Sequence, residues 1–328
     1  MPFMVRIGLL IWLMIWAAIA SPATANPAQL AEQRVQNIGY QLVSENASFC
    51  NDLVARGGFT IAEHGQDWRI SDDPNVLDLA TLPLVRTVSL GGPAESAGLV
   101  PGDRIQAVNG LPVSALSYFD DIADGKRRPK DPTGVVNGEL DHKLAAGPMR
   151  LIIWRDGGEI ELLIEPVQTC PSWFKFTDSD KRIANADGNW VTISSFFADY
   201  AENDDELAAV IAHETAHNIL KHSKFLNAQK VNRGFFGQFG KSAGRIKATE
   251  IEADRLSVWL MANAGYDPNA AIRFWSRFGK KYGKGIFSAS THYRWKKRVA
   301  LLEEEIAKMQ AMNAVDGKYA PPLLTKAQ

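Results

Sequence analysis

The feature that most constrains the fold of this 328-residue chain is a change of pattern along its length. Residues 28–54 carry apolar side chains at helical spacing, with Leu30, Val35, Ile38 and Leu42 on one side. After Gly57 the pattern changes to short apolar runs broken by glycine, proline and aspartate, and beyond Cys170 it is mostly helical again. We therefore predict an α+β protein in which a small β-rich domain lies between an N-terminal helix and a mainly helical C-terminal part.

The β-rich block is expected to hold short strands and one helix. The predicted strands are residues 82–90, 104–108, 149–154 and 160–164, and the predicted helix lies near 136–145. Asn109-Gly110 and Asp156-Gly157-Gly158 are turn signals, and the second of them favours a hairpin. The block is expected to extend over about residues 57–168.

A run inside this block resembles the core of bacterial PDZ domains. It reads GGPAESAGLVPGDRI from Gly91 to Ile105 and is followed by Val108-Asn109-Gly110. The resemblance implies a groove between a strand and the helix near 136–145, in which an extended peptide binds as an added strand. Residues 57–60 match the carboxylate-binding loop of such domains poorly, and residues 126–133 look like an insertion. The alternative is that the block is a structural spacer.

Composition narrows the classes of partner. The chain is 46% hydrophobic, and its 36 basic residues nearly balance its 37 acidic ones. No basic block with interleaved aromatic residues is present, which argues against a nucleic-acid partner. Protein or peptide substrates are the expected partners.

The first residues have the pattern of a signal peptide. A positive charge at Arg6 precedes an apolar run from Ile7 to Ala20 and a small-residue site at Ala23-Thr24-Ala25. The run is shorter than the roughly 20 residues that span a bilayer. We therefore expect residues 1–25 to be removed from an exported, periplasmic protein with at most peripheral membrane contact; the alternative is an uncleaved N-terminal anchor.

Export makes the two cysteines interpretable. Cys50 and Cys170 are the only candidates for each other, and thiols in an oxidising compartment tend to pair. A single disulfide that brackets the β-rich block is the favoured interpretation, and two buried free thiols are the alternative.

The residues His213-Glu214-Thr215-Ala216-His217 form an H-E-x-x-H motif inside a predicted helix, about residues 206–221. Asn203, Asp204 or Asp205 can cap this helix. Histidines four residues apart project from one helical face, where both imidazoles can bind one Zn²⁺. Glu214 lies beside them as a candidate base for the attacking water. His222, five residues after His217, falls off this face and is expected on the surface.

A catalytic zinc ion needs a third protein ligand, and the next predicted helix offers carboxylates. Glu250 and Asp254 are four residues apart and share a face, whereas Glu252 points elsewhere. We therefore assign Glu250 as the third metal ligand and Asp254 as the hydrogen-bond partner of a ligand histidine.

Three segments of the C-terminal half resemble the HtpX, BepA and CAAX-prenyl-endopeptidase family of gluzincins, peptidase family M forty-eight. The matching segments are residues 203–217, 250–255 and 264–268. The resemblance implies a zincin-type metalloprotease domain with a small edge sheet. It implies the same third ligand, Glu250, and a proton-donor or orienting role for Asp254. It also implies misfolded or misassembled envelope proteins as substrates.

The same family has a His-Pro motif with an arginine six residues after the histidine. Here His292 is followed by Arg298 at that spacing, and Tyr293 replaces the proline. His292 is expected to stabilise an oxyanion or to occupy the fourth zinc position in a latent form; a surface histidine is the alternative. Residues 190–194 resemble the family's substrate-binding edge strand, or form an interior strand. Residues 234–240 are interpreted as a mobile flap or a packed loop.

Together these features predict a zinc-dependent metalloendopeptidase that hydrolyses peptide bonds in envelope proteins during quality control. One alternative is a PDZ-mediated binding or chaperone-like protein with a latent zinc site, and another is a zinc-dependent hydrolase of a non-peptide amide. The expected domains are a signal peptide (1–25), an N-terminal helix of the protease (26–56), a PDZ-like domain (57–168), the metallopeptidase domain (169–310) and a C-terminal tail (311–328).

Overall fold

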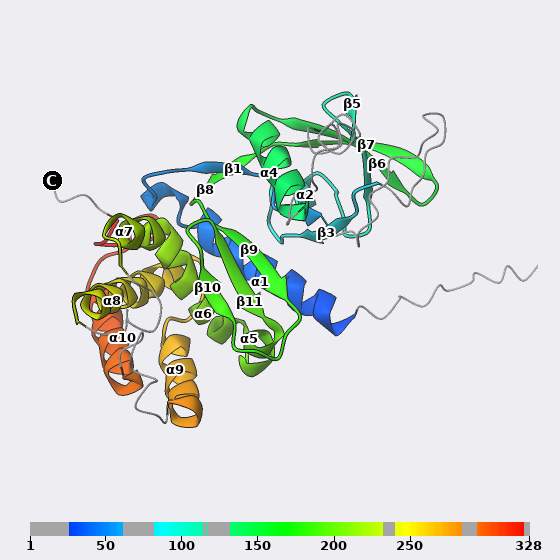
Figure 1. The fold of residues 1–328 in the computed structure, drawn as a ribbon. Coiled ribbons are helices and arrows are strands. Elements are labelled where there is room, and N and C mark those ends of the chain that lie inside the picture. Colours follow the sequence, from blue (N-terminus) through cyan, green and yellow to red (C-terminus); the bar gives the residue numbers. More distant parts are fainter. Residues whose placement is uncertain are drawn as a thin grey trace, which may run out of the picture.

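The computed structural model describes residues 26–61, 82–113, 116, 132–231, 240–283 and 294–324. Their buried apolar side chains form two large clusters, one in the mainly helical part and one in the β-rich part. Figure 1 shows the two corresponding bodies, with strands β1 and β8 running between them. The predicted α+β class is confirmed.

The helical body is built around one long buried cluster that includes Trp259 and Phe274. Its helices are α1 (Pro27–Ser44), α5 (Ser195–Tyr200), α6 (Asp204–Ile219), α7 (His222–Ala228), α8 (Gly240–Asn263), α9 (Asn269–Tyr282) and α10 (Trp295–Gln310). Helix α1 begins at Pro27, where the Asn26 side chain accepts a hydrogen bond from the Ala28 amide. Its buried face packs against α6 and β9, so the N-terminal helix shares the core of the helical body. Val35, Ile38 and Leu42 lie on this face as predicted, whereas Leu30, in the first turn, is exposed.

A small sheet belongs to the same body. It contains β9 (Trp173–Thr177), β10 (Ala184–Ala186) and β11 (Trp190–Ser194) in the order β10-β11-β9. Strand β11 runs antiparallel to β10 and parallel to β9. Of the two interpretations of residues 190–194, the structure shows the interior strand, and β10 is the sheet edge that packs against the metal-motif helix α6.

The β-rich body contains a four-stranded sheet with the order β5-β4-β6-β7. The elements of this body are β2 (Phe59–Ile61), β3 (Val85–Val88), α2 (Pro93–Ser96), β4 (Arg104–Val108), β5 (Leu111–Pro112), α4 (Pro132–Ala145), β6 (Met149–Arg155) and β7 (Gly158–Ile164). Strands β2 and β3 form a separate antiparallel pair. The predicted turns are confirmed: Asn109 and Gly110, and again Asp156 and Gly157, have the positive φ angles that such turns require.

The two chain crossings between the bodies lie side by side. Strand β1 (Val54–Arg56) pairs antiparallel with β8 (Val167–Thr169). Just beyond this ladder, the predicted disulfide joins Cys50 to Cys170 and is confirmed. The η1 turn (Ala47–Phe49) leads from α1 into this junction. At this junction a two-stranded ladder and one disulfide therefore hold the two chain crossings together.

Removing the disulfide should destabilise the helical body. The bond closes a loop with a sequence separation of 120, and a loop of about 100 residues or more gives up to about 4.7 kcal/mol of chain-entropy stabilisation. We expect the Cys50→Ser, Cys170→Ser double variant to lose about 2–5 kcal/mol of unfolding free energy in urea titrations followed by tryptophan fluorescence. Reduced wild-type protein is the matched control. If oxidised wild type had the same unfolding free energy as the double variant and as reduced wild type, the expectation would be contradicted.

Several sequence predictions fall outside the described residues: the signal peptide at 1–25, His64, the insertion at 126–131, the segment 234–239 and His292. Among the helices that the structure does describe, none has the length and apolarity needed to cross a membrane. The segment after α10 packs on the helical body, since Leu324 belongs to its buried cluster and the Tyr319 amide donates to Asn263.

Candidate metal centre

Helix α6 is fixed at its start by side-chain capping. Of the three candidate caps, Asn203 is the one that accepts a hydrogen bond from the Glu206 amide. Glu206 is buried and is bound by two nitrogens of Arg277 from helix α9. The apolar face that follows, from Leu207 to Ala212, is fully buried. This packing sets the height and rotation of the histidines that come next.

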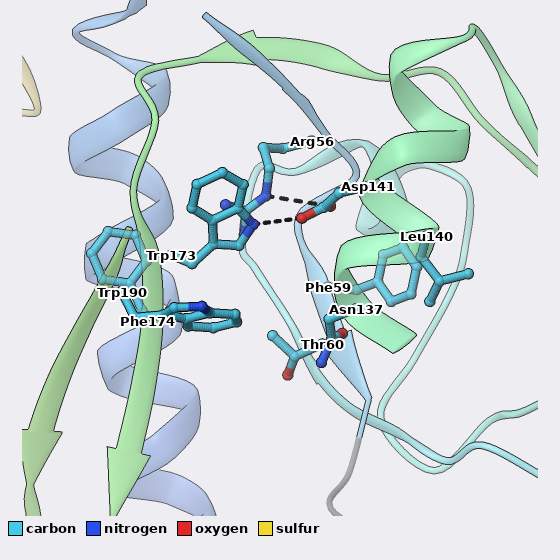
Figure 2. A pocket seen from close by; sticks show the side chains of 9 residues that line it. All are labelled: Arg56, Phe59, Thr60, Asn137, Leu140, Asp141, Trp173, Phe174 and Trp190. Atoms are coloured by element: carbon cyan, nitrogen blue, oxygen red, sulfur yellow. Dashed lines mark hydrogen bonds and ion pairs between the residues drawn. The ribbon is translucent and has the colours of Figure 1, made fainter. Parts of the chain in front are cut away.

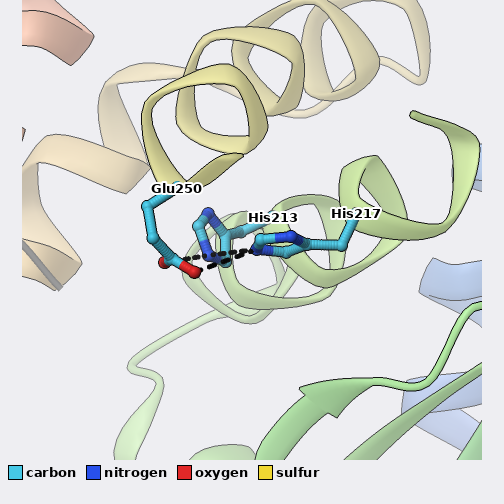
Figure 3. Close-up of side chains that lie close together, drawn as sticks. All are labelled: His213, His217 and Glu250. Atoms are coloured by element: carbon cyan, nitrogen blue, oxygen red, sulfur yellow. Dashed lines mark hydrogen bonds and ion pairs between the residues drawn. The ribbon is translucent and has the colours of Figure 1, made fainter. Parts of the chain in front are cut away.

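The structure brings His213, His217 and Glu250 together. Figure 3 shows the Glu250 carboxylate reaching from α8 toward both imidazoles on α6. The two histidine Nε2 atoms are 3.3 Å apart. The Glu250 oxygens lie 3.4 Å from His213 Nε2 and 3.6 Å from His217 Nε2. Among the described residues, this is the one group of three or more potential ligands that meets within 4.8 Å.

These distances fit a small tetrahedral ion. Zinc binds imidazole nitrogen and carboxylate oxygen at about 2.0–2.2 Å, so ligand atoms at the corners of a tetrahedron are about 3.3–3.6 Å apart. The three separations in this site fall in that range. Two neutral imidazoles and one carboxylate are also the donor set of many catalytic zinc sites, which leave a fourth position open. The residues present therefore fit the metal that the motif implies.

Asp254 lies where the helical spacing places it, on the far side of His213. Its Oδ1 atom is 2.8 Å from His213 Nδ1. Asp254 is buried and also accepts a hydrogen bond from Arg298 of helix α10. The Arg298 guanidinium in turn stacks 3.4 Å from the ring centre of Trp275. A buried carboxylate with a fixed cation behind it holds the imidazole with Nε2 toward the metal position.

The expectation that His222 lies on the surface is wrong. Its side chain is buried, with 4% exposed, and its Nδ1 atom is 2.9 Å from Nδ1 of His217. Five residues along a continuous helix would place it about 140° away from His217. Helix α6 instead ends at Ile219, and Lys221 adopts a left-handed φ of 56° before α7 begins at His222. The chain changes direction there, and this places the His222 ring beside His217.

The remaining candidate site residues are placed as follows. Glu214 lies on α6 directly after His213 and is partly buried. Glu252 lies on α8 and does not belong to the three-ligand group, but its Oε2 atom is 3.0 Å from His222 Nε2. His142 is an exposed residue of α4. The roles of Glu214 and of the three ligands stay predictions.

The metal-free histidines have opposite protonation preferences. Burial and the Arg298 charge act to lower the pKa of His213, but the carboxylates of Asp254 and Glu250 outweigh them and raise it to about 9. Burial and the neighbouring His213 charge lower the pKa of His217 to about 3. Without a metal ion at neutral pH, His213 therefore carries one extra proton as an imidazolium, whereas His217 is neutral.

Metal binding should release that proton. A metal ion binds only neutral imidazole, so below the His213 pKa of about 9 it must displace a proton. We expect the apparent affinity for zinc to rise with pH, by about tenfold per unit between pH 6.5 and 8. Competition with a chromogenic chelator at several pH values measures this slope. Asp254→Asn removes the main charge that raises the pKa and should flatten the slope; a flat slope in the wild type would contradict the assignment.

A separate pocket lies between the two bodies, away from the metal residues. Figure 2 shows Trp173 and Trp190 of the small sheet facing Phe59 and Leu140 of the β-rich body. Trp173 Nε1 donates to Asp141 Oδ2 of helix α4 at 2.5 Å. The Arg56 guanidinium lies 5.1 Å from the Trp173 ring centre and 3.6 Å from Asp141. The edge of the β2 and α4 region therefore contacts the sheet of the helical body.

Two histidines one helical turn apart, a glutamate after the first and a carboxylate from helix α8 are the pattern expected of a single-metal hydrolytic centre. Comparison with known proteins gives the family. Residues 174–247 match peptidase family M48, and residues 84–128 match the PDZ domain. The chain therefore contains an M48 metallopeptidase domain and a PDZ domain.

Similar proteins carry metalloendopeptidase names. The chain is 33% identical to the mitochondrial metalloendopeptidase OMA1 of Schizosaccharomyces pombe, over 36% of this chain and 41% of that one. It is 28% identical to the OMA1 protein of Arabidopsis thaliana, over 35% and 27%. A Vibrio cholerae protein named as a beta-barrel assembly-enhancing protease is 24% identical, over 35% and 30%. The chain thus spans less than half of the length of each of these relatives.

Proposed function

We propose that this protein is a zinc-dependent endopeptidase. The observation that carries the proposal is the set of three ligand-atom separations between His213, His217 and Glu250, each of which suits one tetrahedral zinc ion. Bound zinc supplies a Lewis acid that polarises the scissile carbonyl and makes water more acidic. The relatives named as metalloendopeptidases support peptide bonds as the substrate.

The chain's own residues supply the proton transfers. Glu214 lies next to His213 on α6, where a carboxylate accepts the proton of the attacking water and later returns it to the leaving amine. Asp254 holds His213 in orientation through Nδ1. A site with a purely structural metal has no use for such a base, which favours hydrolysis over a binding protein with a latent site. The oxyanion role of His292 stays a prediction.

Envelope proteins are the proposed substrates, and the periplasm is the proposed compartment. Two features support export: the signal-like pattern of residues 1–25 and the disulfide between Cys50 and Cys170. An uncleaved N-terminal anchor is the alternative arrangement. A role in protein quality control is proposed from the family resemblance, and the name of the Vibrio cholerae relative refers to beta-barrel assembly.

The PDZ domain is proposed to bind an extended segment of the substrate between β2 and α4. Helix α4 lies beside β2 there, and the Asn137 side chain accepts a hydrogen bond from the Ile61 amide. Phe59 and Leu140 line the adjoining pocket and offer apolar contacts to a side chain of the peptide. Deleting residues 57–168 would then change the choice of substrate without removing the metal residues.

Purified full-length protein tests the proposal directly. We expect it to cut a reduced and alkylated protein at internal peptide bonds, to lose this activity in a metal chelator and to regain it when zinc is added back. Mass spectrometry of the fragments distinguishes internal cuts from trimming at the ends. Cleavage that persists in the chelator, or zinc-loaded protein that cuts no unfolded substrate, would contradict the proposal.

A further inference from the structure

The second metal histidine is in contact with a chain of two further side chains. Nδ1 of His217 is 2.9 Å from Nδ1 of His222, and Nε2 of His222 is 3.0 Å from Oε2 of Glu252. The three residues come from α6, α7 and α8 in turn. His222 is buried, whereas the Glu252 side chain is about half exposed, at 48%. The chain of contacts therefore runs from the metal position to the solvent edge.

Only one arrangement of protons satisfies every contact when both imidazoles are neutral. An ionised carboxylate only accepts hydrogen bonds, so His222 carries its proton on Nε2 and donates a hydrogen bond to Glu252. Nδ1 of the neutral His222 is then an acceptor, and His217 must donate to it from its own Nδ1. His217 is left with an unprotonated Nε2, which is the atom that points at Glu250 and the metal position.

We infer that His222 and Glu252 are positioning residues that lock His217 in the tautomer and ring orientation required for metal binding. They do for His217 what Asp254 does for His213, so each ligand histidine has its own support. The inference rests on the proposed metal-dependent function. Partners that orient a ligand histidine are typically worth about 10–100-fold in metal affinity.

The test compares zinc affinity in three variants of the full-length protein. His222→Phe keeps an aromatic ring but removes the acceptor, and we expect zinc affinity to fall by about 10–100-fold in chelator competition. Glu252→Ala should lower it by a smaller factor. His222→Asn keeps an oxygen acceptor near the position of Nδ1 and should recover part of the loss. Glu303→Ala, at an exposed glutamate of α10, is the matched control.

Two measurements separate positioning from a general loss of structure. If Glu252 acts through His222, adding Glu252→Ala to His222→Phe should lower zinc affinity no further. In ¹⁵N NMR of the zinc-loaded protein, the His217 ring should show a protonated Nδ1 in the wild type. Thermal melting of the metal-free variants checks that each is folded.

Affinities of His222→Phe and Glu252→Ala within twofold of the Glu303→Ala control would overturn the inference. So would additive losses in the double variant, or no recovery in a folded His222→Asn protein. These outcomes are distinct from failure of the proposed function. A wild type that binds zinc but cuts no peptide would refute the function, while the zinc affinities would still decide the role of His222 and Glu252.

Discussion

Replacing Glu214 by glutamine should abolish nearly all peptide hydrolysis while zinc stays bound. The substitution preserves the shape of the side chain on α6 and leaves all three proposed ligands in place. It removes the carboxylate that we propose takes a proton from water, and loss of a general base costs about 10²–10⁴-fold in rate. Zinc content and kcat measured on the same preparation test both halves of the expectation.

The matched control for this variant is Glu303→Gln, which makes the same chemical change at an exposed position of α10. It should keep both zinc and activity. A Glu214→Gln protein that hydrolyses peptides at more than about a tenth of the wild-type rate would rule out the proposed base.

Replacing Glu250 by alanine should remove the metal itself. Only the two imidazoles of α6 would remain, without the carboxylate that we propose as the third zinc ligand. We expect the affinity for zinc to fall by more than the roughly 100-fold upper range seen for orienting residues, and hydrolysis to fall with it. Chelator competition and elemental analysis measure the loss.

Neighbouring carboxylates on the same helix provide the comparison. Asp254→Ala should weaken zinc binding by about 10–100-fold, because it removes the partner of His213 and not a ligand. Glu252→Ala should have a smaller effect than either. If Glu250→Ala kept its zinc and Glu252→Ala lost it, the third ligand would have to be reassigned to Glu252.

The parts of the site that the sequence predicts well are those decided by helical spacing alone. The pairs His213 and His217, and Glu250 and Asp254, are each four residues apart on an unbroken helix, so their shared faces follow directly from the helical repeat. Helical spacing alone does not predict that α6 and α8 meet. That contact is predicted from metal chemistry, because a catalytic zinc site needs a third ligand.

The contact between His217 and His222 shows where this reasoning fails. It depends on a break in the helix at Lys221, a lysine with a left-handed backbone conformation. Lysine gives no signal for such a conformation, which glycine and asparagine adopt more readily. The order of the small sheet was equally out of reach, since β9 and β11 pair across intervening residues and their sequences do not reveal which one lies inside.

The disulfide prediction rests only on the presence of two cysteines and on an expected oxidising compartment. The prediction of the β-rich fold rests only on a local run of turn and strand residues. What neither could predict is how the inserted body contacts the helical one. Asp141 and Trp173 are 32 residues apart and belong to two bodies with separate hydrophobic cores. Their hydrogen bond therefore depends on tertiary packing that no local pattern encodes.

The Cys50–Cys170 disulfide at the base of the insertion also determines what happens when a protease cuts the chain once within the insertion. Any one cut between residues 51 and 169, whether by a foreign enzyme or by a second copy of this protein, leaves two fragments tied together through Cys50 and Cys170. Such a nicked molecule migrates as one species until a reductant is added. It also keeps α1, which lies on the N-terminal fragment, tethered to the helices that hold the metal residues.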